Sequence, residues 1–130
     1  MANAMTRAGL ETRARLRSLL DELRQFASSR GDDIIVRVMS QWISLKSKNG
    51  GRVFAELRPS KERIEVFILP PPRELGFNRL IDRAPPSQGW GWFKSKFVVD
   101  GNGGGATALR LLRISYLSSL RRDKPSSRRR

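Results

Sequence analysis

The stretch that decides the fold is Gln41–Leu69, which reads QWISLKSKNGGRVFAELRPSKERIEVFIL. Polar and apolar residues alternate over 41–46, 52–58 and 63–69, and this period of two is typical of β-strands. Two segments rich in turn-forming residues, KNGG and PSKE, separate the three runs. The stretch therefore predicts a three-stranded antiparallel meander.

The meander has two different faces, because successive side chains of a strand point in opposite directions. One face is apolar and is predicted to line the core; it holds Ile43, Leu45, Val53, Ala55, Leu57, Ile64, Val66 and Ile68. The other face mixes rings with charges; it holds Trp42, Ser44, Lys46, Phe54, Glu56, Arg58, Arg63, Glu65 and Phe67. Aromatic rings among basic side chains are the most informative functional pattern in the chain.

Helices are predicted on both sides of these strands. Leu10–Ser28 and residues 106–120 both carry apolar residues at three- and four-residue steps, as amphipathic helices do. Alternation over Lys94–Val99 predicts a fourth strand after a long connection at 73–88, whereas residues 34–39 fit either a short helix or a strand. The expected fold class is α+β, an antiparallel four-stranded sheet with N- and C-terminal helices packed on one face.

Length and composition restrict the function classes. A chain of 130 residues has room for one modest core, and we expect a frayed segment at 1–9, a single domain at 10–120 and a disordered basic tail at 121–130. The chain has no Cys and no His, so disulfides, thiolate ligands and the commonest general base are excluded. We expect no cofactor and no metal. The sequence has no targeting signal or membrane-spanning stretch, which predicts a cytoplasmic protein without membrane contact.

The charge of the chain indicates a polyanionic partner. The formal net charge is +14, from 26 Lys and Arg against 12 Asp and Glu. The last ten residues hold six basic side chains and one acidic side chain, so most of the excess lies outside the tail. A basic body attracts nucleic acids over long range, which makes DNA or RNA the expected partner. Solubility, or a genomic bias towards arginine, explains the same charge without a ligand.

Two arrangements of the aromatic and basic residues are open. In the first, bases stack on the rings or a partner docks on them (Trp42, Phe54, Phe67, Trp90 and Trp92), and cations meet the phosphates (Lys46, Lys48, Arg52, Arg58, Arg63, Lys94 and Lys96). In the second, which we favour, the rings of the sheet pack under Trp90, Trp92 and Phe93 as a second small core, because so much exposed apolar area is unfavourable. Phosphate contacts would then fall to Lys46, Lys48, Arg52, Lys94, Lys96 and the tail, without reading of the bases.

Two other function classes fit some of the same residues. A magnesium-dependent nuclease needs two or three carboxylates and a nearby lysine, and Glu56 and Glu65 share one predicted face of neighbouring strands. Arginine stands where that lysine is expected, and pairing of the two glutamates with Arg58 and Arg63 explains them without catalysis. We therefore predict a non-catalytic module. The alternative to nucleic-acid binding is a protein-interaction or accessory domain of a nuclease or restriction-type system.

Several segments also resemble a known family. They are ISLK at 43–46, VFAELRP at 53–59, IEVFI at 64–68, Gly89–Phe93 with the strand that follows, and the last helix near Tyr116. On these segments the chain resembles domain of unknown function 5655, a small module sometimes labelled "predicted transport protein". The resemblance implies an α+β module that occurs alone or fused to restriction-endonuclease-like domains, with no established activity. It transfers no functional residue to this chain.

Overall fold

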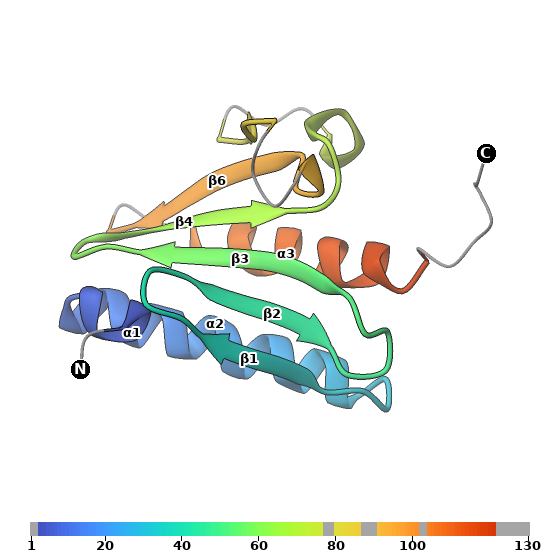
Figure 1. The fold of residues 1–130 in the computed structure, drawn as a ribbon, viewed down its shortest axis with the longest axis horizontal. Helices are drawn as coiled ribbons and strands as arrows, with labels where there is room; N and C mark the ends of the chain where they lie inside the picture. The colour runs from blue at the N-terminus through green and yellow to red at the C-terminus, as the bar shows by residue number, and fades with distance from the viewer. Residues whose placement is uncertain (1–2, 77–79, 87–90, 102–103, 122–130) are drawn as a thin grey trace.

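A computed structural model describes residues 3–76, 80–86, 91–101 and 104–121 of the protein. Its helical elements are α1 (Ala4–Arg7), α2 (Leu10–Ser28), a 3-10 turn η1 (Pro72–Leu75) and α3 (Gly105–Ser119). Its strands are β1 (Ile34–Val38), β2 (Ile43–Ser47), β3 (Val53–Pro59), β4 (Arg63–Ile68), β5 (Asp82–Arg83) and β6 (Ser95–Asp100). Figure 1 shows the sheet in front of the two long helices.

The strands form one antiparallel sheet in the order β1-β2-β3-β4-β6-β5. The predicted α+β class is confirmed, but the expected four strands are too few, since the sheet has six. The ambiguous run at 34–39 supplies β1, which pairs with β2 from Ile34 opposite Ser47 to Val38 opposite Ile43. The other added strand, β5, is two residues long and lies within the segment that was expected to be a connection.

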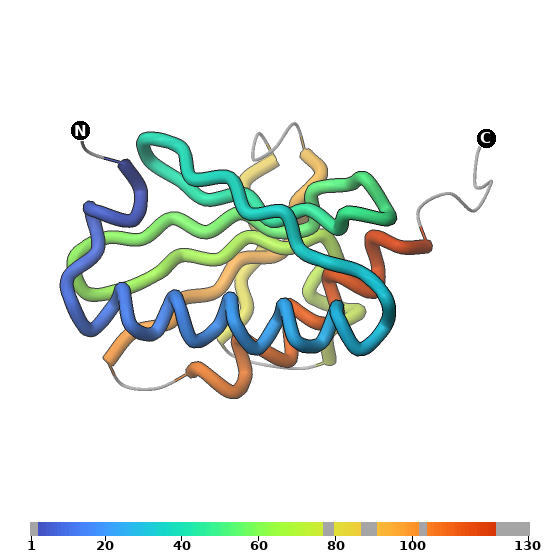
Figure 2. Tube along the Cα trace, turned by 90° about the horizontal axis from the view of Figure 1, so that it is seen from below, coloured from blue at the N-terminus to red at the C-terminus, as the bar shows by residue number. Residues whose placement is uncertain are grey.

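Both long helices cover the same face of the sheet, as Figure 2 shows from below. α2 has the predicted bounds, and α3 begins one residue before the predicted start. Their apolar stripes bury side chains such as Leu16 and Leu23 of α2 and Leu111 and Leu112 of α3. Burial of a full leucine side chain favours folding by about 1.5–3 kcal/mol, so these stripes position the helices on the sheet. We call this side of the sheet the helix face and the opposite side the open face.

The apolar residues of the meander line the helix face as predicted, with one exception. Seven of the eight are fully buried there, namely Ile43, Leu45, Ala55, Leu57, Ile64, Val66 and Ile68. The exception is Val53, which is only half-buried. It pairs with Lys46, and Lys46 lies on the open face because it alternates with Leu45. Val53 therefore belongs to the open face, and its assignment to the core face was wrong.

A β-bulge at the start of β3 explains this exception. Leu45 pairs with Ala55 but Lys46 pairs with Val53, so the ladder between β2 and β3 skips Phe54. An extra residue in one strand reverses the alternation of side chains on the two sides of the bulge. Phe54 accordingly lies in the core with no exposed surface, and its ring contacts Tyr116 of α3 edge to face at 5.5 Å between centroids. The prediction that Phe54 offers a stacking or partner face is wrong.

The segment at 1–9 that was expected to be frayed contains the short helix α1. The side chain of Asn3 accepts a hydrogen bond from the backbone of Thr6, and the hydroxyl of Thr6 accepts one from the backbone of Asn3, which caps α1. The Ala4 amide also donates to the Met39 carbonyl at 2.8 Å, and Ala4 is fully buried. These contacts tie α1 to the β1–β2 turn.

The start of α2 is fixed to the turn between β3 and β4. The amide of Gly9 and the hydroxyl of Thr12 both donate to the Lys61 carbonyl, at 3.0 and 2.9 Å. A Cβ atom on Gly9 would lie 2.8 Å from that carbonyl oxygen, so the close approach requires glycine here.

Among the described residues, no helix combines the length and the apolar character that crossing a membrane requires.

Candidate functional site

Basic side chains converge on a pocket at the end of the sheet where β4 stops and β6 begins. Of the described residues that line it, four are basic, Arg52, Arg73, Arg83 and Lys94, and Glu74 is acidic. The pocket has a volume of about 900 Å³ and is open to solvent. We call it the basic pocket. Because its cations come from four separate segments of the chain, the fold rather than a local charge run creates it.

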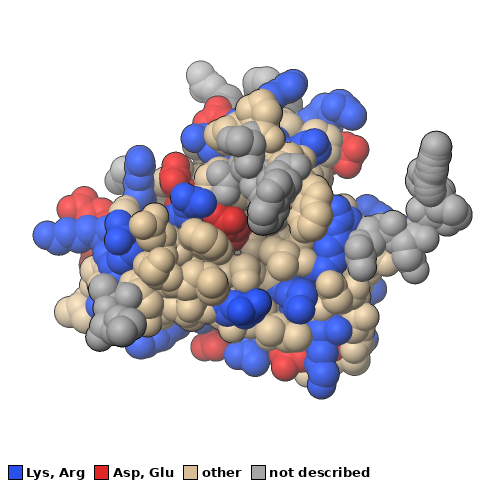
Figure 3. Space-filling model, in the orientation of Figure 1, with Lys and Arg blue, Asp and Glu red and all other residues tan. Residues whose placement is uncertain are grey.

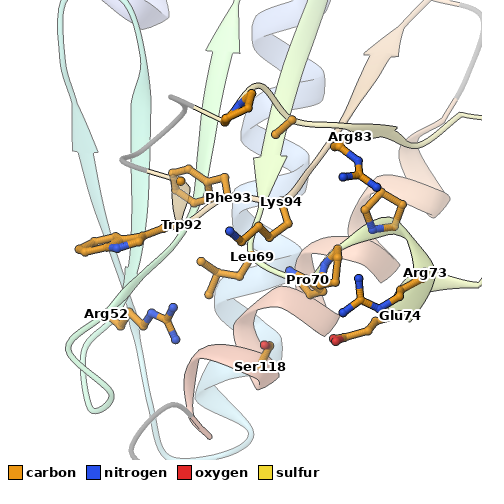
Figure 4. A pocket seen from close by; sticks show the side chains of 15 residues that line it. Arg52, Leu69, Pro70, Arg73, Glu74, Arg83, Trp92, Phe93, Lys94 and Ser118 are labelled. Carbon is orange, nitrogen blue, oxygen red and sulfur yellow. The ribbon is translucent and has the colours of Figure 1, made fainter. Parts of the chain in front are cut away.

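The basic pocket also has apolar and aromatic walls. Leu69 and Phe93 line it as buried residues, while Trp92 is 53% exposed. Figure 4 shows Trp92 and Arg52 on one side of the pocket, Arg73 and Arg83 on the other side, and Lys94 with Leu69 between them. The arrangement places a ring at one side of the cavity and guanidinium groups at both sides.

Backbone hydrogen bonds and prolines hold the segments that form this pocket. Pro70, Pro71 and Pro72 end β4, because proline cannot donate to a ladder, and the chain then forms η1. The Ser95 hydroxyl donates to the Pro70 carbonyl at 2.6 Å, and the Lys94 amide donates to the Ile68 carbonyl at 3.0 Å. These bonds join the end of β4 to the start of β6, so the pocket wall is continuous with the sheet.

Sequence reasoning found some of the pocket and missed the rest. Arg52, Lys94 and Trp92 were predicted as site residues, and the structure brings them together. Arg73 and Arg83 were missed because they lie in the segment that was interpreted as a connection. One sequence feature could have located Arg73. Three consecutive prolines at 70–72 end β4, and Arg73 follows them directly.

The other predicted cations do not join the basic pocket. Lys46 and Lys96 are half-buried on the open face, and Lys48 is exposed in the β2–β3 turn, where its amide donates to the Asp33 carbonyl. In Figure 3, uncharged side chains cover much of the open face, and Lys and Arg are spread around it rather than gathered in one patch. The predicted site residues therefore do not form a single basic surface.

Arg63 lies at the far end of β4 from the basic pocket. It lines a second hollow of about 590 Å³, next to the start of α2. That hollow is balanced in charge, with three basic side chains (Arg15, Lys61 and Arg63) and three acidic ones (Glu11, Glu62 and Asp100). Acidic groups repel phosphates, so this second hollow fits a polyanion less well than the basic pocket does.

Arg58 is held between two rings on the open face. Its guanidinium carbon lies 5.4 Å from the centroid of the Trp42 ring and 5.8 Å from that of Phe67, which is cation–π distance. Its Nε atom also donates to Glu56 at 2.6 Å. Phe67 is buried and Trp42 is half-buried in this cluster. Both rings therefore already contact a cation of this chain, and Phe67 is too buried to stack on a base.

The second small core expected on the open face is therefore present only in part. Phe67 and Phe93 are both buried, but Trp92 is half-exposed at the basic pocket and Phe54 belongs to the main core. Trp90, which was predicted both as a stacking residue and as a cover for these rings, lies outside the described residues, as does the tail from residue 122 onwards.

Both carboxylates that were considered for a magnesium site lie next to Arg58. Glu56 is bound to Arg58, and Glu65 pairs with Arg58 in the register between β3 and β4. Within the ranges that the structure describes, no group of three or more Asp or Glu side chains is close enough to hold a metal ion. The pairing of glutamate with arginine that sequence reasoning offered as the alternative accounts for Glu56.

A half-buried polar cluster around Asp32 was also missed by sequence reasoning. One carboxylate oxygen accepts hydrogen bonds from the hydroxyls of Ser47 and Tyr116, and the other accepts from the amides of Asn49, at 2.9 Å, and of Asp33, at 2.7 Å. Burial opposes ionisation of Asp32, but these four bonds favour the charged form and keep its pKa below the usual value. Burial and the bond to Asp32 raise the pKa of Tyr116 to about 12. The cluster joins the β2–β3 turn to α3.

Comparisons with known proteins leave the family open. A scan against protein-family models, a search of the curated proteins and a search of the solved structures each found no match. The resemblance to domain of unknown function 5655 remains a prediction.

Proposed function

We propose that this protein is a non-catalytic nucleic-acid-binding module whose phosphate contacts lie in and around the basic pocket. The observation that supports this proposal most directly is the convergence of Arg52, Arg73, Arg83 and Lys94 on one cavity, against one acidic side chain in its described lining. Phosphates of a nucleic-acid backbone are bound mainly by arginine and lysine, and arginine adds bidentate geometry. A pocket that concentrates such groups binds polyanions more strongly than the same charges spread over a surface.

The position of the C-terminal tail fits the same proposal. Ser118 of α3 lines the basic pocket, and the described chain continues from there only to Arg121. The residues after Arg121 include Arg122, Lys124 and three consecutive arginines at 128–130. A tail that starts beside the pocket adds phosphate contacts to the same strand without a second folded site.

Binding of labelled oligonucleotides, followed by fluorescence anisotropy over a salt series, tests this proposal. Counterion release predicts a steep fall in affinity between about 50 and 200 mM salt, with a slope of roughly −0.7 per phosphate contact for single strands. A variant that ends at Arg121 should still bind, with a shallower slope. Affinity that is absent at low salt, or that is lost completely with the tail, would contradict a folded binding site.

Lys94 and Lys96 offer a matched pair of charge reversals for this experiment. Lys94 lines the basic pocket, whereas Lys96 lies two residues further along the chain on the open face, opposite Phe67 and Asp82. We expect Lys94→Glu to weaken binding strongly and Lys96→Glu to weaken it only through its smaller long-range effect. Equal losses in the two variants would show that net charge, rather than the pocket, governs affinity.

A second candidate function is protein interaction along the β1 edge of the sheet. Within the described part of the chain β1 pairs only with β2, and Ile35, Val38 and Met39 are each more than a third exposed there. Exposed edge strands with apolar residues are the usual templates for added strands. An interface of this kind depends little on salt, so partner binding that persists at high salt and is lost on Val38→Lys would favour it over nucleic-acid binding.

A further inference from the structure

We infer that the basic pocket receives one unpaired nucleotide, with its base against Trp92 and its phosphate among Arg73, Arg83 and Lys94. This inference rests on the proposed function and specifies its ligand, a single-stranded nucleic acid or a free nucleotide rather than a duplex. The chemistry shared by both sources is an aromatic base joined to a phosphate.

The size and walls of the pocket fit such a ligand. A volume of about 900 Å³ lies within the range of roughly 300–1,000 Å³ that is usual for small-molecule sites. Leu69 and Phe93 line the pocket as apolar side chains that are mostly buried, and Trp92 is an aromatic lining residue that is 53% exposed. An extended phosphate chain needs cations but no apolar floor, whereas a base needs both a ring and apolar surface.

The two kinds of group that a nucleotide needs lie on opposite sides of the cavity. Trp92 lies on one side, while Arg73 and Arg83 lie on the other, with the amine of Lys94 between them (Figure 4). A base stacked on the Trp92 ring would therefore direct its sugar and phosphate across the pocket towards the guanidinium groups. Arg52, beside Trp92, is placed to meet the phosphate of the preceding or following nucleotide.

This geometry discriminates against duplex DNA. Bases in a duplex are paired and stacked inside the helix, so a base reaches a side pocket only after it is flipped out. Unstacking and unpairing lower the affinity for a duplex, while an unpaired strand enters without that cost. Among the described rings of the predicted aromatic face, Trp92 is the one that lines this pocket, whereas Phe54 is in the core, and Phe67 and Trp42 contact Arg58.

Four probes separate the contribution of the base from that of the phosphate. They are a short labelled single strand, its duplex, a strand of equal length and charge made of abasic sugar-phosphate units, and a free nucleoside monophosphate. Each is titrated against the full chain and against Trp92→Ala, Trp92→Phe and Trp42→Ala. Trp42→Ala is the matched control, since it removes an indole that lies outside the pocket. Circular dichroism verifies that each variant is folded.

We expect the single strand to bind more tightly than both the duplex and the abasic strand. Trp92→Ala should lower the affinity for the single strand by about 5- to 150-fold, which corresponds to the loss of one stacked base, and should leave the abasic strand unaffected. Trp92→Phe should recover part of the loss, and Trp42→Ala should leave binding unchanged. If the monophosphate competes with the strand for binding, a free nucleotide is a sufficient ligand. If it does not compete, the ligand is the strand.

The outcomes distinguish a failure of this inference from a failure of the proposed function. If Trp92→Ala binds the single strand as tightly as the unaltered protein while Lys94→Glu weakens it, the pocket contacts phosphates only and the nucleotide inference is wrong. Equal affinity for the base-containing and abasic strands leads to the same conclusion. If no strand binds at low salt, the proposed function and the inference are both wrong.

Discussion

The hydroxyl of Ser115 on α3 donates a 2.6 Å hydrogen bond to the backbone carbonyl of Phe54, the residue that the β3 bulge leaves out of the ladder with β2. The same oxygen accepts a 3.0 Å hydrogen bond from the amide of Leu69, just after β4. One fully buried side chain therefore satisfies backbone groups of two segments and fixes α3 to the sheet.

Ser115→Ala should destabilise the protein by about 1–3 kcal/mol, because it leaves a buried carbonyl and a buried amide without this partner. Ser119→Ala is the matched control: Ser119 is also buried on α3, but its hydroxyl donates within the helix, to the Tyr116 carbonyl. Urea denaturation of the two variants measures the difference. If Ser119→Ala lowers the unfolding free energy as much as Ser115→Ala does, the hydrogen bonds of Ser115 to the sheet contribute no more than a bond within the helix.

Phe54→Ala should destabilise the protein by about 3–5 kcal/mol, as expected for a fully buried phenylalanine. The neighbouring change Val53→Ala should cost much less, since Val53 is half-buried on the open face. Both changes in unfolding free energy are obtained from the shift of the denaturation midpoint, provided that the dependence of free energy on denaturant concentration is unchanged. A larger loss for Val53→Ala would place the bulge at a different residue.

Stability should fall at both ends of the pH range because of the Asp32–Tyr116 pair. The folded state lowers the pKa of Asp32, so its contribution is present above the ordinary value of 3.8 and is lost as pH falls below that value. The folded state raises the pKa of Tyr116 from 10.0 to about 12, so its contribution is present below pH 10 and is lost as pH rises from 10 towards 12.

Tyr116→Phe tests the alkaline half of this prediction. The variant lacks the phenol, so the difference in unfolding free energy between it and the unaltered protein should shrink between pH 10 and 12. Urea melts at a series of pH values measure that difference, and other groups that titrate in both proteins cancel. A difference that stays constant across this range would show that the Tyr116 phenol ionises as readily in the folded protein as in the unfolded chain.

Arg58→Ala should destabilise the protein by about 1–2 kcal/mol and make Trp42 more exposed. The guanidinium contributes cation–π contacts with two rings and a hydrogen bond to Glu56, each of modest value at a partly exposed site. Tryptophan emission should shift to longer wavelength, and the shift should be absent when Trp42→Phe is combined with Arg58→Ala. A shift that survives in the double variant would come from another tryptophan.

The sequence predicted both long helices, the meander and seven of eight core positions because each depends on a regular period. The bulge breaks that period: a single extra residue moved Phe54 to the core and Val53 to the open face. β5 was missed because two residues are too short to show alternation. Residues 34–39 became a strand through pairing with β2, which is a tertiary effect that local pattern does not reveal.

The candidate site was predicted less well than the fold, for a physical reason. Arg52, Arg73, Arg83 and Lys94 lie in separate segments, and their convergence depends on strand order and on the turn after Pro72. The pattern of a sequence identifies which residues share a strand face. It does not show which ends of distant segments lie close together in the folded protein. Asp32 was missed for the same reason, since its partner Tyr116 is 84 residues away.

The strand order also has a consequence for how the protein folds. β1 to β4 are joined to their sheet neighbours by short turns, whereas β6 reaches β4 only after the long segment that carries β5 is closed. Loop-closure entropy makes such distant pairing slower than hairpin formation. We therefore expect the basic pocket to be assembled last, when β6 docks on β4. In pulse-labelled hydrogen exchange, the amide protons of Ala84 and Lys94 should then gain protection later than those of the meander. A ligand bound in the basic pocket would stabilise the part of the molecule that forms last.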